Sequence, residues 1–208
     1  MRRALVVLAA AVGLVAAAPA GGQNGHGCDA PGSKTVRSSA KVRVYSKGAN
    51  LYGCVRATGV TRTLYRYSRP LPNEGSSWDR VRLAGHRVAY VLSHVCTVCG
   101  DGGPFASIHE FELRSGRHRS LSKVRERPDH TGTGVNALVL DRCGRIAYRA
   151  ILRGTYARPE PDPELHVWVG QSQRRVDRGE IHRIRLAPTA VHWVRGDEPR
   201  SAPLEPPC

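Results

Sequence analysis

The sequence predicts an all-β protein built from antiparallel strands. After the first twenty residues, no stretch shows the 3.6-residue apolar periodicity of a helix, and apolar residues alternate with polar ones over short runs. Glycine, proline and asparagine separate these runs, as they do between the strands of hairpins. Strands are expected at 42–46, 51–57, 62–67, 81–84, 88–95, 107–113, 118–122, 137–140, 146–152, 165–169, 184–186 and 190–194.

The first twenty residues have the pattern of a signal peptide. Arg2 and Arg3 precede the apolar run 4–15, and Ala18-Pro19-Ala20 offers small residues for cleavage near Ala20. The apolar run is too short for a convincing membrane span. We therefore expect a secreted, extracellular protein without a transmembrane span.

The exported part is expected to be one domain with a short lead. Residues 21–39 are rich in glycine, serine and basic side chains and poor in large apolar residues, which predicts a flexible lead unless Cys28 is bonded. Residues 40–208 are long enough for a single domain with its own core.

Six cysteines follow the signal peptide, and an even number outside the cytoplasm predicts disulfides. Two pairings are open for four of them: Cys28 with Cys208, or Cys28 with Cys54 and Cys143 with Cys208. The remaining Cys96 and Cys99 form a CxxC motif.

A local bridge is the expected state of Cys96 and Cys99. One CxxC supplies two of the roughly four ligands of zinc, and the nearby His94 and His109 belong to no spaced second pair. A thioredoxin-like role needs a helix after the motif, which the following Gly-Asp-Gly-Gly-Pro forbids. No metal site is therefore predicted.

Positive charge dominates the composition. The chain has 32 Lys and Arg against 17 Asp and Glu, a formal net charge of +15, nearly all of it from arginine. Such a chain is attracted to anionic polymers or envelope components, whereas nucleic acid is not an expected partner. Several arginines alternate with apolar residues, so we expect them on solvent faces of strands: Arg43, Arg56, Arg62, Arg66, Arg82, Arg87 and Arg149.

Four segments of the chain are similar to one another. They are "VRVYSKGANLYGCV" from Val42, "VRLAGHRVAYV" from Val81, "LVLDRCGRIAYRA" from Leu138 and "IRLAPTAVHWV" from Ile184. Each is a strand, a turn and a strand with an aromatic residue near its end. These aromatic residues are 38, 58 and 45 residues apart, an irregular spacing that is centred on the length of a propeller blade. The matching places of the aromatic residues predict packing between units rather than a sugar platform: Tyr52, Tyr90, Tyr148 and Trp193.

The repeats resemble β-propeller proteins of the TolB or WD40-like kind, of secreted bacterial type. There the outline "g-rvAyv" followed by "i-v-dl-sg--r-l" recurs once per blade, and here it is clearest where "VRLAGHRVAYV" precedes "SIHEFELRSGRHRSLS". The resemblance covers 42–204 and implies about four antiparallel propeller-like blades, in a partial or open propeller. It implies no catalytic residue.

Two long connections are the candidate binding surface. Those at 96–105 and 153–164 follow the strands of Tyr90 and Tyr148, so the resemblance places them side by side on one face. The candidate ligand-binding residues are Asp101, Arg153, Tyr156, Arg158, Glu160 and Asp162.

No catalytic signature is present: neither a GxSxG elbow, nor HExxH, nor a P-loop. We therefore expect a disulfide-bonded binding or interaction module at the cell exterior, without catalytic residues or cofactors. The alternative is an extracellular glycan hydrolase, which needs two carboxyl groups about 5 to 10 Å apart. The candidates for its acid and base are Asp101, Glu160, Asp162 and Glu164. A third possibility is a structural envelope protein.

Overall fold

The computed structural model describes residues 27–67, 74–96, 105–121, 132–153 and 162–208, and within them the chain is all β. The strands are β1 (Lys34–Ser38), β2 (Val42–Lys47), β3 (Asn50–Val55), β4 (Thr61–Tyr65), β5 (Glu74–Ala84), β6 (Arg87–Cys96), β7 (Phe105–Glu112), β8 (Arg117–Leu121), β9 (Gly132–Leu140), β10 (Ile146–Arg153), β11 (Glu164–Val169), β12 (Ser172–Arg178), β13 (Ile181–Leu186), β14 (Ala190–Arg195) and β15 (Glu198–Pro203). Each of the predicted strands is present.

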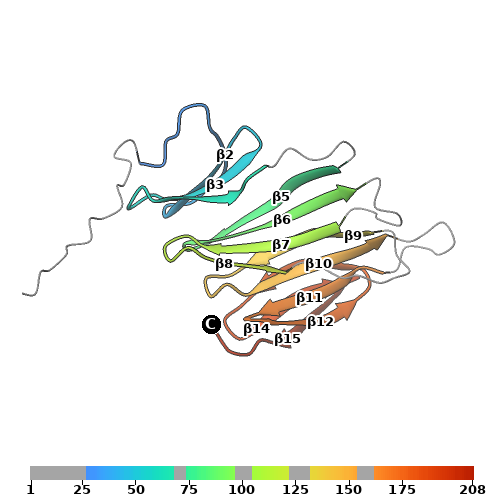
Figure 1. Ribbon diagram of the computed structural model, residues 1–208. Helices are drawn as coiled ribbons and strands as arrows, with labels where there is room; N and C mark the ends of the chain where they lie inside the picture. Colours follow the sequence, from blue (N-terminus) through green and yellow to red (C-terminus); the bar gives the residue numbers. More distant parts are fainter. Residues whose placement is uncertain (1–26, 68–73, 97–104, 122–131, 154–161) are drawn as a thin grey trace, which may run out of the picture.

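The strands form four antiparallel sheets, each a run of consecutive strands. The sheets are A (β1-β2-β3-β4), B (β5-β6-β7-β8), C (β9-β10-β11-β12) and D (β13-β14-β15). They follow one another in chain order from β2 and β3 at one end to β14 and β15 at the other (Figure 1). Among the described strands no closed barrel or propeller is detected.

Each inner sheet buries both faces, because successive side chains of a strand point to opposite sides. In β6, Val88, Tyr90 and Leu92 pack into the core shared with sheet A, whereas Ala89 and Val91 pack into the core shared with sheet C. In the same way β10 divides its residues between the core shared with sheet B and the one shared with sheet D. The sheets are therefore stacked face to face on three successive cores.

An aromatic residue on the second strand recurs at each core. Tyr90 and Tyr148 are 1% and 0% exposed, Trp193 is 5% exposed, and each faces the preceding sheet, which confirms the predicted packing role. In sheet A the matching position is Tyr45 on β2, so the alignment of Tyr52 with Tyr90 was wrong by one strand. Tyr52 lies opposite Tyr45 on β3, and their rings stack at 5.4 Å.

The first strands of the four sheets lie side by side: β1 contacts β5, β5 contacts β9, and β9 contacts β13. Each carries a bulge in its pairing with the second strand, after Thr35, Asp79, Val135 and His182 respectively. A bulge places two residues opposite one and re-aims their side chains. The stack therefore has one edge along which four irregular strands run together.

Three strands were not predicted: β1, β12 and β15. Each lies at the edge of its sheet and is mostly exposed, so apolar alternation is weak or absent. Residues 34–38, expected in the flexible lead, form β1 instead, because Cys28 is bonded to Cys54 at a Cα distance of 5.6 Å.

The outer edge of β15 is nearly free of N–H donors. Leu204 donates its N–H to Thr189 O, which sets the ladder so that Ala202, Arg200 and Glu198 direct their N–H groups to β14. The N atoms that face outward belong to Pro199, Ser201 and Pro203. Two of these three are prolines, so the last sheet ends on an edge that can offer one N–H.

The two disulfides tie the first and the last described segments of the chain to the sheets. Cys28–Cys54 fixes the N-terminal lead against the outer face of sheet A, beside Tyr45 and Ala30. Cys143–Cys208 joins the C-terminal segment to the turn between β9 and β10. Of the two pairings left open by the sequence, the structure thus contains the second. The Cys96–Cys99 motif lies outside the residues whose side chains are described.

Candidate anion-binding groove

Most of the predicted ligand-binding residues cannot be placed. Asp101, Tyr156, Arg158 and Glu160 lie outside the described residues, as do the loops that carry them. Arg153 is the last residue of β10, and nothing is described of its side chain.

Asp162 is exposed, and its carboxylate lies 3.7 Å from the Arg178 guanidinium. This is a surface ion pair of little energetic weight.

Glu164 is not a loop carboxylate, which corrects the proposed acid or base pair of a hydrolase. It is the first residue of β11 and is 2% exposed. Its carboxylate lies 3.0 Å from His166 Nε2 and accepts a hydrogen bond of 3.1 Å from Arg175. A buried carboxylate with these partners is part of the packing of sheet C.

Arginines cross between neighbouring sheets and donate to backbone carbonyl oxygens. They do not simply cover solvent faces, which corrects the expectation for Arg62, Arg82, Arg87 and Arg149. The bridges at the turns are Arg62 to Leu113 O at 2.9 Å, Arg87 to Arg142 O at 3.0 Å, Arg119 to Gly170 O at 2.5 Å, Arg145 to Ala187 O at 2.7 Å, and Arg174 to Pro203 O. Arg43 and Arg56 instead hold the lead and β1, through Cys28 O and Ser39 O.

The same kind of bridge joins the first strands. Arg80 and Arg82 of β5 donate from Nε to Val135 O at 2.5 Å and to Leu138 O at 2.8 Å, both on β9. Arg149 of β10 donates to Ile181 O at the start of β13. Carbonyl oxygens order these guanidinium groups without neutralising them.

Few carboxylates accompany this positive charge. Within the described part of the chain, Arg37, Arg82, Arg149 and Arg183 make no ion pair, and the Asp79 carboxylate lies 3.9 Å from Arg80 Nε. Burial raises the pKa of Asp79 despite the neighbouring arginines. Burial also lowers the pKa of Arg82, and the positive charges of Arg37 and Arg80 lower it further. Like charges that disfavour one another in this way favour a bound anion.

A hollow of about 360 Å³ opens at this edge. Its walls are the first strands of sheets C and D and the arginines between them. The residues that line it include Arg82, Asn136, Arg149, His182 and Arg183. We call this hollow the arginine groove, and include in it Arg80 and Arg37, whose positive charges act on the lining residue Arg82.

Two of its arginines have strained backbones. Arg80 and Arg183 adopt φ angles of 51° and 52°, in the left-handed region that non-glycine residues avoid. Both lie in the bulges of their first strands. Such strain persists where the surrounding structure demands a particular side-chain direction, and it is concentrated at functional positions.

Sequence analysis missed Arg37, Arg80 and Arg183 as site residues. A signal was present, since "RVRL" from Arg80 and "RIRL" from Arg183 extend the two matched repeats by one residue each. Their meeting at one edge depends on contacts between sheets, which the sequence does not reveal.

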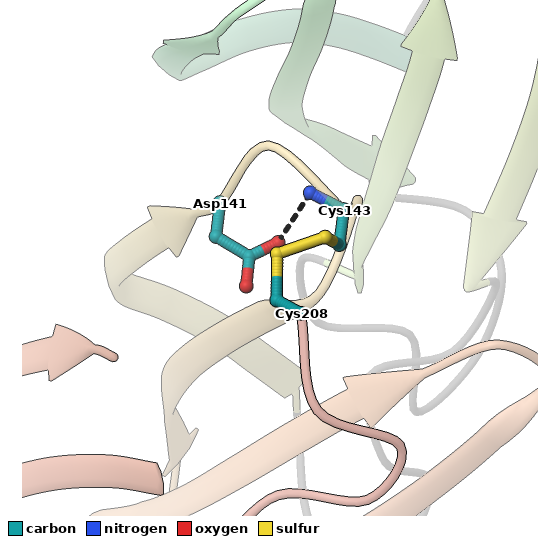
Figure 2. A group of neighbouring side chains, drawn as sticks. All are labelled: Asp141, Cys143 and Cys208. Carbon is teal, nitrogen blue, oxygen red and sulfur yellow. Dashed lines mark hydrogen bonds between the residues drawn. A yellow bond between two sulfur atoms is a disulfide. The ribbon is translucent and has the colours of Figure 1, made fainter. Parts of the chain in front are cut away.

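One further cluster has the composition of a metal site but not its chemistry. Ligand atoms of Asp141, Cys143 and Cys208 lie within 4.8 Å of one another (Figure 2). The two sulfurs are bonded to each other, so neither is a thiolate. The Asp141 carboxylate accepts hydrogen bonds from the N–H groups of Cys143 and Arg145 and from the Arg145 side chain. The cluster is therefore a braced turn.

Comparison with known proteins finds no matching family model, curated protein or solved structure. Among the described residues, no helix is long and apolar enough to cross a membrane.

Proposed function

We propose that this protein is an exported binding module whose arginine groove takes anionic polymers or anionic envelope components at the cell exterior. The observation that carries the proposal is an edge lined by ordered guanidinium groups that donate hydrogen bonds to backbone and amide carbonyl oxygens, with Asp79 as the one carboxylate described beside them. Linear polyanions bind such surfaces through many individually weak charge contacts, with strong salt dependence.

Location at the cell exterior rests on two features. Residues 1–20 have the pattern of a signal peptide, and two disulfides link cysteines of the remaining chain. Disulfides persist in oxidising compartments outside the cytoplasm.

We infer further that the four sheets are blades of an open, propeller-like array. This inference is supported by the consecutive strand order of each sheet, the face-to-face stacking and the row of first strands. First strands line the central axis in propellers, so the arginine groove corresponds to an axial surface.

The test is the affinity of the full exported chain for a fluorescent linear polyphosphate, measured by anisotropy at several salt concentrations. The decisive variant is Arg37→Gln with Arg183→Gln, because no described hydrogen bond of either side chain joins sheets. We expect weaker binding and a salt slope reduced by about 0.7 for each phosphate that is no longer neutralised.

The matched control is Arg66→Gln with Arg117→Gln. It removes the same charge from exposed positions, one just after β4 and one in β8, on the opposite side of the sheets. Equal losses of affinity in both double variants would show attraction to net charge alone and would contradict the groove, as would an absence of polyphosphate binding by the unaltered protein.

A further inference from the structure

Three polar side chains form a hydrogen-bonded line on the face of sheet B that is turned towards sheet A. Ser107 Oγ lies 3.0 Å from His109 Nε2, and His109 Nδ1 lies 3.1 Å from His118 Nε2. Ser107 and His109 alternate on β7, so their side chains share one face, and His118 is on the adjacent β8. A hydroxyl, an imidazole and a third orienting group in this order are the arrangement of an activated nucleophile.

Neighbouring aromatic rings hold both imidazoles in place. The His109 ring stacks on Tyr90 at 5.1 Å, and the His118 ring stacks on Phe111 at 4.1 Å. Tyr90 is itself fixed by donating its hydroxyl hydrogen to Leu64 O at 2.7 Å. The line is therefore braced on the core between sheets A and B, while Ser107 stays partly accessible and His118 is exposed.

Sheet C contains the same arrangement with different chemistry. His166 stacks on Tyr148 at 5.3 Å, with its Nε2 3.0 Å from Glu164 and its Nδ1 3.2 Å from Gln173. The two ring nitrogens of His166 are thus paired with a carboxylate and an amide.

Sheet B has a hydroxyl in place of the carboxylate and a second imidazole in place of the amide. Only in sheet B does the imidazole contact a nucleophilic side chain among these corresponding residues.

His109 is in the protonation state that a base requires. Burial, followed by the nearby charges of His118 and His94, lowers the pKa of His109 to about 4, so its ring is neutral at pH 7. With a hydrogen on Nδ1 that is donated to His118, His109 presents the Nε2 lone pair to the Ser107 hydroxyl. Ser107 Oγ also lies 3.4 Å from Leu92 O, a longer contact.

We propose that Ser107 is a reactive nucleophile that accepts acyl groups from esters, with His109 as its base and His118 as a positioning residue. Ser107 Oγ bonds to the carbonyl carbon, and its proton passes to His109 Nε2. The bond from carbon to the alcohol oxygen breaks, and the alcohol leaves with that proton. Water then attacks the carbonyl carbon of the acyl-serine and gives its proton to His109 Nε2. The bond from this carbon to Ser107 Oγ breaks, Oγ takes the proton back, and the carboxylic acid leaves. This activity goes beyond anion binding and uses none of the groove residues.

The test is labelling of the full exported chain with an alkyl fluorophosphonate, in which Oγ displaces fluoride from phosphorus. Peptide mass spectrometry locates the adduct, and we expect it on Ser107. Ser107→Ala should abolish the labelling, and His109→Gln should slow it about 100-fold, the usual contribution of a general base.

The matched control is Ser76, whose Oγ lies 2.7 Å from His94 Nδ1. Ser76→Ala should leave the labelling rate unchanged. The proposal is overturned if folded protein carries no adduct on Ser107, or if His109→Gln is labelled as fast as the unaltered chain. Circular dichroism confirms that each variant is folded.

The role of His118 has a readout that packing alone would not change. His118→Gln copies the amide of sheet C and removes a positive neighbour that lowers the pKa of His109. The pH at which labelling is half-maximal should therefore rise. An unchanged pH profile in this variant would exclude His118 as the positioning residue.

Discussion

Arg80 and Arg183 occupy corresponding places in two different sheets. Each lies in the bulge of a first strand, close to the second-strand aromatic residue Tyr90 or Trp193, with φ angles of 51° and 52°. They differ in their contacts, because Arg80 donates to Val135 O, whereas no described side-chain hydrogen bond or ion pair involves Arg183.

This difference predicts opposite effects of the same substitution. A left-handed residue that is not glycine carries about 1 to 2 kcal/mol of strain, of which glycine's greater chain entropy offsets about 0.5 to 1. Arg183→Gly should therefore leave the free energy of unfolding unchanged or raise it by up to about 1.5 kcal/mol. Arg80→Gly loses a charged hydrogen bond as well and should lower it by about 1 kcal/mol. Urea denaturation measures both, and a larger loss of stability in Arg183→Gly would contradict this account.

Glu110 should be essential to the contact between sheets B and C, because it holds the two arginines of sheet B that donate to carbonyl oxygens of sheet C. It is 2% exposed and accepts from Arg87 at 2.6 Å and from Arg119 at 2.8 Å. Glu110→Gln removes the charge and leaves two guanidinium groups near the buried amide, so we expect a decrease of about 3 kcal/mol in the free energy of unfolding. Glu198→Gln, which breaks a fully exposed pair with Arg200, should leave the free energy of unfolding nearly unchanged. Equal decreases in urea would refute the distinction.

The two disulfides should differ in their contribution to stability. They close loops of 26 and 65 residues, and the chain-entropy model assigns about 3.5 kcal/mol to a loop of the first size and about 4.3 kcal/mol to one of the second. Replacing Cys143 and Cys208 by serine should therefore lower the denaturant midpoint more than replacing Cys28 and Cys54. The reverse order in guanidinium unfolding would argue against chain entropy as the dominant contribution.

Acid should destabilise the fold through His109. Its pKa is about 4 in the folded protein against an ordinary value of 6.5, so the unfolded chain binds the proton more tightly. Stability is fully present above pH 6.5 and falls as the pH is lowered towards 4. His118, whose pKa burial also lowers, acts in the same direction. Thermal midpoints between about pH 7 and pH 4.5 should fall less steeply in His109→Gln, and identical slopes would exclude this histidine as a cause.

Strands that bury both faces could be predicted from the sequence, whereas three mostly exposed edge strands, β1, β12 and β15, could not. β6 and β10 carry apolar residues at successive positions because cores lie on either side. β12, "SQRRVDR", pairs through its backbone, a contact that leaves little trace in the sequence. The misalignment of Tyr52 with Tyr90 has a related cause. Because β1 has no clear apolar pattern, the sequence indicates β2 as the first strand of sheet A, and Tyr52 on β3 takes the place that belongs to Tyr45 on β2.

The candidate sites depend on distances between sheets. The sequence presents Arg82 as one arginine of an alternating strand, whereas its proximity to Arg37 and Arg149 follows from the row of first strands. Ser107 and His109 could have been paired from their spacing of two residues. The proximity of His118 could not be predicted, because it depends on the pairing of β7 with β8, in which His118 lies opposite Phe111.

Pro199 and Pro203 determine how readily another strand can pair with the edge of sheet D. Repeating sheets that stack face to face invite further strands, from the same chain or from a neighbour, wherever a backbone edge is open. The edge of β15 offers one outward N–H among three positions, so it is a poor template for such growth. Strand addition to sheet D at this edge is thus disfavoured.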